Sequence, residues 1–318
     1  MNIEIRVNTI EEAYTLMESQ VNIIAVGNEN CVYKVPKYDE IRDLVNEARN
    51  NNKKIRVVFP KTPNIHFDNM LELLEKIANL DVLVTINDYG LMFRAKDIKL
   101  KNGFAIGRVL AFSLLTSSPW YDLLVEGENQ EIKKALATSN MDSTYKLDFV
   151  KTLGANEIEI EYLKEVCENT ERIIEKTFKV SAHYESCLVG YSRCCPVKKM
   201  LQEETSTCAE EIACSEPYYI EFKEKFNTIP VQNKKNNYNS MTHYVEDELV
   251  KKIFTPLMVV GNGLYKKNEN NNFEYKNVST MIINSVFYDD KEHLENVFEL
   301  LKIKKEISEC SIVKKQIG

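Results

Sequence analysis

The sequence lacks the segments that mark membrane and secreted proteins. No apolar run approaches the roughly 18 residues that a membrane-spanning helix requires. The first ten residues, MNIEIRVNTI, do not place a basic segment before an apolar run, as a secretory signal peptide does. We therefore expect no membrane span and a cytoplasmic protein, in which cysteines stay reduced.

The common catalytic motifs are also missing. There is no GxSxG elbow, no P-loop and no HExxH pair. Gly261-Asn-Gly263 is a bare GxG and predicts a turn rather than a nucleotide site. The four histidines are scattered along the chain: His66, His183, His243 and His293. Hydrolysis by a zinc ion or an activated serine is therefore not indicated.

The chain has no excess of positive charge. Its net charge is −7, which argues against a nucleic-acid scaffold that depends on bulk positive charge. The nearest basic cluster, Lys53, Lys54 and Arg56, is predicted to be a solvated loop. A local basic patch stays compatible with this composition, so nucleic acid is left open as a partner.

What is present is an alternation of strands and helices. Ile41, Leu44, Val45 and Ala48 recur at helical spacing, as do the apolar residues from Met70 to Ile77, and each set predicts one buried helix face. Short apolar runs between these helices predict strands, namely Ile3–Val7, Asn22–Val26, Lys54–Phe59, Val82–Ile86 and Phe104–Gly107. The alternation predicts an α/β fold built on a TIM-like (β/α) barrel, complete or distorted.

The second half predicts a less regular continuation, with a cysteine-rich loop and a C-terminal α+β extension. Predicted strands are Glu157–Ile160, Phe178–His183, Tyr219–Phe226, Pro256–Val260 and Ser279–Phe287. Predicted helices run from Tyr162 to about Lys176 and from Glu292 to Lys304. We divide the chain into a barrel-like domain, 1–217, with a cluster loop at 187–214, and a part, 218–318, that completes or extends the barrel.

Five of the eight cysteines fall in that loop: Cys187, Cys194, Cys195, Cys208 and Cys214. Thiolates are soft ligands that suit zinc or iron–sulfur clusters. No C-x2-C pair of a zinc ribbon occurs, whereas cluster ligands commonly combine an irregular loop with one distant residue. Cys31 follows the second strand and can be that distant ligand. We expect Cys167 in the apolar core and Cys310 to be incidental.

Several motifs resemble the collagenase-like (U32) peptidase family over about residues 1–220. They are His183-Tyr-Glu-Ser-Cys187, Gly190-Tyr-Ser-Arg-Cys, Asn87-Asp-Tyr-Gly90 and Gly107-Arg108. The nearest resemblance is to the UbiV-like branch, partner of UbiU-like proteins in oxygen-independent ubiquinone biosynthesis. It implies a [4Fe–4S] cluster held by Cys31, Cys195, Cys208 and Cys214. Cys187 and Cys194 are spaced like a UbiU-type pair, so they stay open as alternative ligands.

The resemblance further implies hydroxylation of an aromatic or nucleobase substrate without molecular oxygen. Prephenate would be the oxygen donor, and a second family member would form a heterodimer with the chain. Arg108 or Arg94 would bind a donor carboxylate, and His183 and Asp88 would position the substrate. A surface salt bridge, a structural histidine and a helix N-cap are the alternatives for Arg108, His183 and Asp88. A peptidase and a non-catalytic cluster carrier are the alternative functions.

Overall fold

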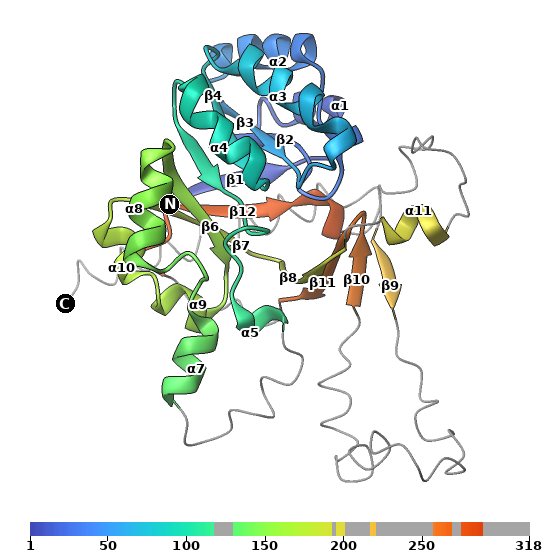
Figure 1. Ribbon diagram of the computed structural model, residues 1–318. Helices are drawn as coiled ribbons and strands as arrows, with labels where there is room; N and C mark the ends of the chain where they lie inside the picture. Colours follow the sequence, from blue (N-terminus) through green and yellow to red (C-terminus); the bar gives the residue numbers. More distant parts are fainter. Residues whose placement is uncertain (118–129, 193–194, 201–216, 221–256, 269–274, 289–318) are drawn as a thin grey trace, which may run out of the picture.

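A computed structural model of the chain describes residues 1–318 except for 118–129, 193–194, 201–216, 221–256, 269–274 and 289–318. Eight parallel strands form a closed barrel, because β1 pairs with both β2 and β12 (Figure 1). The strands are β1 (Asn2–Arg6), β2 (Ile23–Gly27), β3 (Lys54–Phe59), β4 (Val82–Ile86), β5 (Phe104–Ile106), β6 (Ala155–Glu161), β7 (Lys179–His183) and β12 (Thr280–Asn284). The predicted TIM-like barrel is confirmed.

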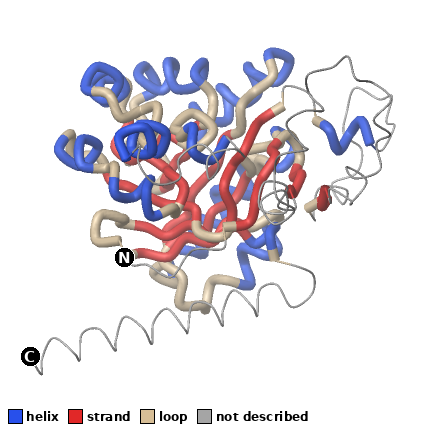
Figure 2. The backbone as a smooth tube through the Cα atoms, turned by 90° about the horizontal axis from the view of Figure 1, so that it is seen from below, coloured by secondary structure: helices blue, strands red, loops and turns tan. Residues whose placement is uncertain are grey.

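Helices surround this barrel (Figure 2). Their bounds are α1 (Ile10–Thr15), α2 (Tyr38–Asn50), α3 (Phe67–Ile77), α4 (Tyr89–Ile98), α5 (Leu114–Ser117), α7 (Gln130–Ala137), α8 (Thr144–Thr152), α9 (Lys164–Glu168) and α10 (Glu171–Glu175). The predicted apolar faces of α2 and α3 are buried against the strands. No helix in the described ranges is long and apolar enough to span a membrane.

A second, antiparallel sheet stands at the carboxyl ends of the barrel strands. Its order is β8 (Ser186–Tyr191), β11 (Gly263–Lys267), β10 (Leu257–Val260) and β9 (Tyr218–Ile220). β8 leaves β7 after two residues, so the small sheet begins directly at the barrel mouth (Figure 1). The boundary that we placed at 217/218 runs through this sheet, and β12 then completes the barrel.

Three expectations need correction. The segment from Cys187 begins as strand β8 rather than as loop, and a short helix, α11 (Pro196–Met200), follows. Lys54 and Arg56, expected in a solvated loop, lie in strand β3, and Arg56 is buried. The helix expected from Tyr162 is broken into α9 and α10. Between them, the Thr170 hydroxyl donates a hydrogen bond to the Cys167 carbonyl. The helix predicted at Glu292–Lys304 lies outside the described residues.

The Gly261-Asn-Gly263 segment is the turn between β10 and β11, as predicted. Gly261 has a φ of +55°, which a two-residue hairpin of this kind requires at its first central position. A Cβ on Gly263 would lie 2.6 Å from Asn30 Oδ1, so the hairpin packs directly on the loop after β2. The turn therefore fixes the small sheet against the residue that precedes Cys31.

Candidate functional site

The interior of the barrel is filled by charged side chains rather than by the branched aliphatic layers usual in this fold. Arg56 bridges two strands, with Nε 2.7 Å from Glu4 Oε2 and Nη2 2.8 Å from Glu157 Oε1. One layer nearer the mouth, Arg6 Nη2 lies 2.5 Å from Glu159 Oε1. All five side chains are buried. The barrel therefore has a polar centre in which each cation contacts carboxylates from other strands.

Arg108 is the central cation at the mouth. Its Nη2 lies 2.6 Å from Glu29 Oε1, its Nη1 lies 3.3 Å from Glu161 Oε2, and it also donates to the Ser186 carbonyl at 3.0 Å. Its guanidinium stacks on the ring of Tyr265, 4.9 Å from the centroid. The surface salt bridge that we weighed for Arg108 is wrong, because this side chain is fully buried. Most of its donors are occupied, and it joins the barrel to the small sheet.

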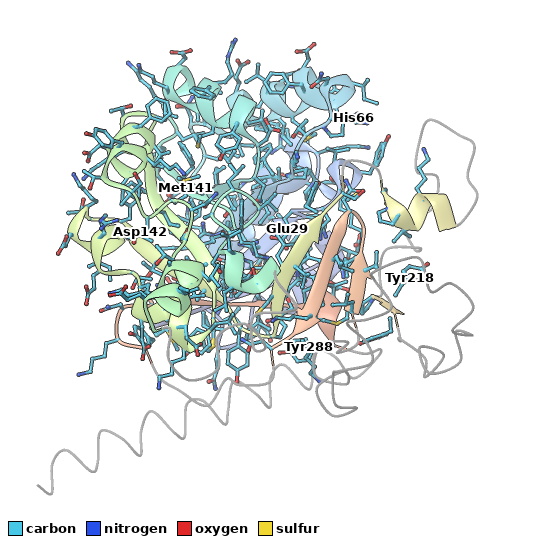
Figure 3. All side chains as sticks on the ribbon, turned by 60° about the horizontal axis from the view of Figure 1, so that its bottom comes forward. Glu29, His66, Met141, Asp142, Tyr218 and Tyr288 are labelled. Atoms are coloured by element: carbon cyan, nitrogen blue, oxygen red, sulfur yellow. The ribbon has the colours of Figure 1, made fainter. Side chains whose placement is uncertain are left out.

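Glu29 is the main partner of Arg108 and lies beside the small sheet (Figure 3). Burial alone would raise the pKa of Glu29, but Arg108 and other cations lower it to about 2. The carboxylate is therefore ionised at neutral pH and also accepts a bond of 2.8 Å from the Tyr265 hydroxyl. A fixed negative charge thus sits next to Arg108 and the loop that carries Cys31.

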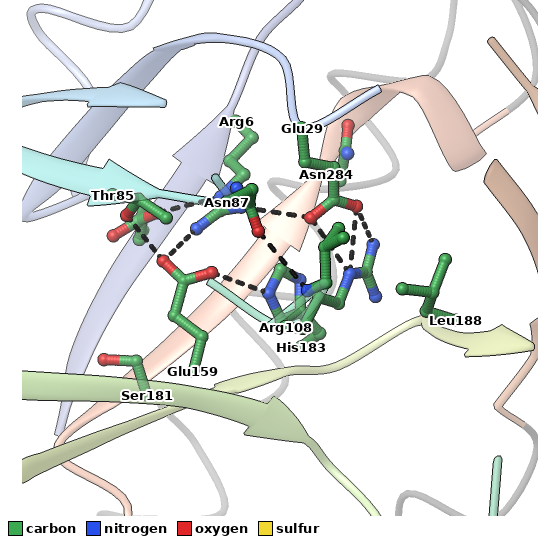
Figure 4. Close-up of polar contacts among 12 residues, drawn as sticks. Arg6, Glu29, Thr85, Asn87, Arg108, Glu159, Ser181, His183, Leu188 and Asn284 are labelled. Carbon is green, nitrogen blue, oxygen red and sulfur yellow. Dashed lines mark hydrogen bonds and ion pairs between the residues drawn. The ribbon is translucent and has the colours of Figure 1, made fainter. Parts of the chain in front are cut away.

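His183 presents a basic nitrogen inside the mouth. Burial, together with the charges of Arg108 and Arg6, lowers the pKa of His183 to about 4, so the imidazole is neutral at pH 7. Its Nε2 lies 3.1 Å from the Glu159 carboxylate and carries the proton of that bond (Figure 4). Its Nδ1 is then a hydrogen-bond acceptor, and it has no partner among the described residues.

Further buried atoms at the mouth have no hydrogen-bond partner within the described ranges. Among them are Glu185 Oε2 and Arg6 Nη1, which lies 3.6 Å from Glu29 Oε2. Arg6 and Glu185 are close enough to interact electrostatically, as are Arg6 and His183. Buried polar atoms are nearly always bonded. The mouth therefore offers a guanidinium donor, an imidazole acceptor and a carboxyl group for a small polar molecule or ordered water.

The Glu185 carboxyl predicts a measurable pH effect. Burial raises its pKa from 4.5 to about 8, so the folded protein keeps a proton that the unfolded chain releases. The contribution of this proton to the free energy of unfolding is fully present below about pH 4.5 and is lost as the pH rises through about 8. Glu185→Gln cannot ionise, and we expect its stability relative to wild type to increase by roughly 2–4 kcal/mol from about pH 5 to about pH 9. Urea unfolding at both pH values measures this, and parallel pH profiles would contradict it.

Asp88 serves as the N-cap of α4, the alternative that we weighed for it. Its Oδ1 accepts from Leu91 N at 3.1 Å and its Oδ2 from Thr62 N at 3.2 Å. The neighbouring Asn87 donates to the Phe59 carbonyl and accepts from Val109 N at 3.3 Å. The two motifs at 87–90 and 107–108 are thus packed together, and their contacts are structural.

Gly107 leaves space for Asn87. A Cβ on Gly107 would lie 2.0 Å from Asn87 Oδ1, so an added methyl group must displace that side chain from its buried hydrogen bonds. We expect Gly107→Ala to lower the free energy of unfolding by about 2–4 kcal/mol. Gly190→Ala is the matched control, because no atom of the described residues lies within 4 Å of its added Cβ. Equal urea midpoints for the two variants would contradict this account.

Two of the four predicted cluster ligands are described. Cys31 follows β2 and begins the 3₁₀ helix η1 (Val32–Lys34), and Cys195 immediately precedes α11. Both are half-buried. The pKa of Tyr191, at the end of β8, is raised to about 12, chiefly by burial and further by Glu29, Cys31 and Cys195. The two cysteines therefore lie near the same phenol although they are far apart in sequence.

The remaining cysteines fall into two groups. Cys187 and Cys167 are fully buried, and burial raises the pKa of each thiol, to about 12 for Cys167. Such sites disfavour the thiolate that binds a metal. Cys167 packs in the core as predicted. Cys194, Cys208, Cys214 and Cys310 lie outside the described residues, and within the described ones no three His, Cys, Asp or Glu side chains form a metal-binding group.

No family model matches the chain, and no curated protein matches it. Among solved structures, the U32 peptidase Mk0906 aligns at 13% identity and a TM-score of 0.42, covering 89% of this chain and 92% of that one. D-psicose 3-epimerase from Clostridium cellulolyticum, solved with D-tagatose, aligns at 11% identity and a TM-score of 0.33, covering 58% and 73%. A U32 peptidase is thus a structural neighbour. These matches are too weak to support a conclusion about function. The barrel is established by its strand pairing.

The sequence contained an unused signal for the polar interior. Glu157, Glu159 and Glu161 alternate with Ile158 and Ile160, so the three carboxylates share one face of β6. The side chains on one face of a barrel strand all point either into the barrel or away from it, and these three carboxylates point into it. Glu4 and Arg6 alternate in the same way with Ile3, Ile5 and Val7. Glu29 and Tyr265 carried no comparable signal, because their partners come from distant segments.

Proposed function

We propose that the chain binds a [4Fe–4S] cluster at the carboxyl end of the barrel, as the UbiV-like resemblance implies. Cys31 and Cys195 would be two of the ligands, and Cys208 and Cys214 the others. The observation that carries the proposal is that Cys195 packs against the small sheet, while Asn30, which precedes Cys31, contacts the β10–β11 turn of the same sheet. Both thiols are half-buried, as soft ligands at the edge of a cluster would be.

The proposed activity is oxygen-independent hydroxylation of an aromatic or nucleobase substrate, by the chain alone or with a second family member. When bound, the cluster would supply electron transfer or a Lewis-acidic iron. The unpartnered atoms of Arg6, His183 and Glu185 would then hold a substrate or a carboxylate donor such as prephenate. Arg6 replaces Arg108 in this role: it also pairs with carboxylates, but its Nη1 has no hydrogen bond to the described residues, whereas both terminal nitrogens of Arg108 are bonded.

Two other functions have less support. Neither described histidine, His66 or His183, has a serine or cysteine as hydrogen-bond partner in the described part of the chain, so no nucleophile–base pair favours a peptidase. A cluster carrier without catalysis remains the alternative proposal. The unbonded polar atoms of Arg6, His183 and Glu185 at the barrel mouth favour the catalytic form.

Purification under strict anaerobic conditions tests the cluster. We expect about four iron and four sulfide per chain, as the cluster formula requires, with visible absorbance that is lost in air. The same preparation exposed to air and treated with a chelator is the control. An anaerobic preparation that is folded, colourless and free of iron would refute the proposal.

A further inference from the structure

Four aromatic side chains are exposed on two neighbouring helices of the outer ring. On α4, Tyr89 and Phe93 are each 51% exposed, and on α8, Tyr145 is 89% and Phe149 46% exposed. Each pair is spaced i, i+4, so its two rings share one helix side. Phe93 and Phe149 touch across the helices, with centroids 5.7 Å apart. The four rings form one patch, here called the α4–α8 patch, and such exposed apolar patches mark interaction sites.

A cationic hollow adjoins this patch. It has a volume of about 170 Å³ and is lined by Lys96, Lys99 and Lys151 without any acidic side chain. Lys96 and Lys99 form no ion pair with the described residues, and Lys151 donates to the Lys176 carbonyl and the Thr177 hydroxyl, so its charge is not neutralised. Lys96 follows Phe93 by three residues, so the hollow continues the same helix side.

The charge of this region is opposite to that of the whole chain. Helices α4 and α8 with the C-cap of α4 carry five cations, Arg94, Lys96, Lys99, Lys146 and Lys151. With the N-cap Asp88 counted as well, they carry three acids, Asp88, Asp97 and Asp148, so their net charge is +2 in a chain of −7. Asp148 is itself paired with Lys176. The region therefore favours an acidic partner, and it disfavours pairing with the same region of a second copy, which would place cations opposite cations.

The shape limits what that partner is. A hollow of about 170 Å³ is smaller than the roughly 300–1,000 Å³ of sites for drug-sized molecules. A row of aromatic rings with cations at one end instead fits a helix that lies along the α4–α8 patch. The 10 residues of α4 span about 15 Å, or roughly three turns of a partner helix. We propose that the α4–α8 patch binds an amphipathic helix of another protein that carries acidic residues at one end of its apolar stripe.

A labelled model peptide tests the proposal on the full-length protein. The probe is a helix-stabilised peptide of about 14 residues with leucines along one face and glutamates at one end. The matched probe has lysine in place of glutamate. By fluorescence anisotropy we expect the glutamate peptide to bind at least about tenfold more tightly, and Phe93→Ala/Phe149→Ala to weaken it by a similar factor. Tyr14→Ala, at a ring 42% exposed on α1, should leave binding unchanged.

A second variant keeps the test valid if the double alanine protein is unstable. Lys96→Glu/Lys99→Glu changes exposed side chains only, and it should reverse the preference between the two peptides. Equal binding of both peptides, or unchanged binding by both variants, would overturn the proposal. So would a wild-type dimer that becomes monomeric in Phe93→Ala/Phe149→Ala, or a single-stranded oligonucleotide that alone binds at this patch.

Discussion

Replacing Cys195 with alanine is expected to abolish iron and sulfide binding by the anaerobically purified protein. Cys195 is half-buried against the small sheet, which the loop before Cys31 also contacts, and loss of one of four thiolates removes an anchor from the proposed cluster. The same loss is expected for Cys31→Ala. Iron and sulfide are quantified per folded chain, with circular dichroism to show that each variant retains the barrel.

Cys167→Ala provides the matched control. Cys167 is buried in the core, where it packs next to Val166, and burial raises the pKa of its thiol to about 12. Its loss removes a small apolar group and should leave iron content unchanged. If Cys195→Ala and Cys31→Ala keep full iron content, the ligand set is wrong. If Cys187→Ala alone loses the iron, the buried strand cysteine is a ligand after all.

Replacing Arg108 with methionine is expected to lower the free energy of unfolding by about 3–5 kcal/mol. The substitution leaves the carboxylates of Glu29 and Glu161 in the barrel mouth without their main cation. It also removes the hydrogen bond to the Ser186 carbonyl and the stacking on Tyr265, so the small sheet loses one of its links to the barrel. Urea unfolding followed by circular dichroism measures the change.

Two comparisons separate this effect from simple loss of a cation. Arg42→Met removes an exposed arginine that pairs with Asp39 and Asp43, and it should leave stability unchanged within the error of the measurement. Adding Glu29→Gln to Arg108→Met should recover part of the lost stability, because it removes one uncompensated charge. Strict additivity of the two changes would show that Glu29 and Arg108 are not coupled.

The barrel could be predicted because its signals are local. The apolar runs at Lys54–Phe59 and Val82–Ile86 coincide with β3 and β4 at both ends. The helical spacing of Ile41, Leu44 and Val45 coincides with the buried face of α2. Each such element buries one side against a neighbour that is close in sequence, so periodicity alone locates it.

The small sheet could be predicted only in part, and the charged interior could not be predicted in this way. Strands β9 and β10 overlap the predicted strands Tyr219–Phe226 and Pro256–Val260, whereas β8 and β11 were not predicted. β8 contains Gly190 and Tyr191 and ends before a run of cysteines, and its partner β11 is more than seventy residues away in the chain. Its pairing supplies the structure that its own sequence does not indicate. The network around Arg108 likewise joins Glu29, Glu161 and Tyr265, and only the closed barrel brings these residues together.

The pairing of β1 with β12 has a consequence for synthesis. The register joins Asn2 to Thr280 and Arg6 to Asn284. One edge of β1 therefore stays unpaired until almost the whole described chain has been synthesised. Until then β1 exposes an unpaired edge, and Arg6 lacks Glu159 for as long as β6 is unmade. Truncated chains that end before β12 should therefore need chaperone protection, and closure should be a slow, late step because it joins such distant segments.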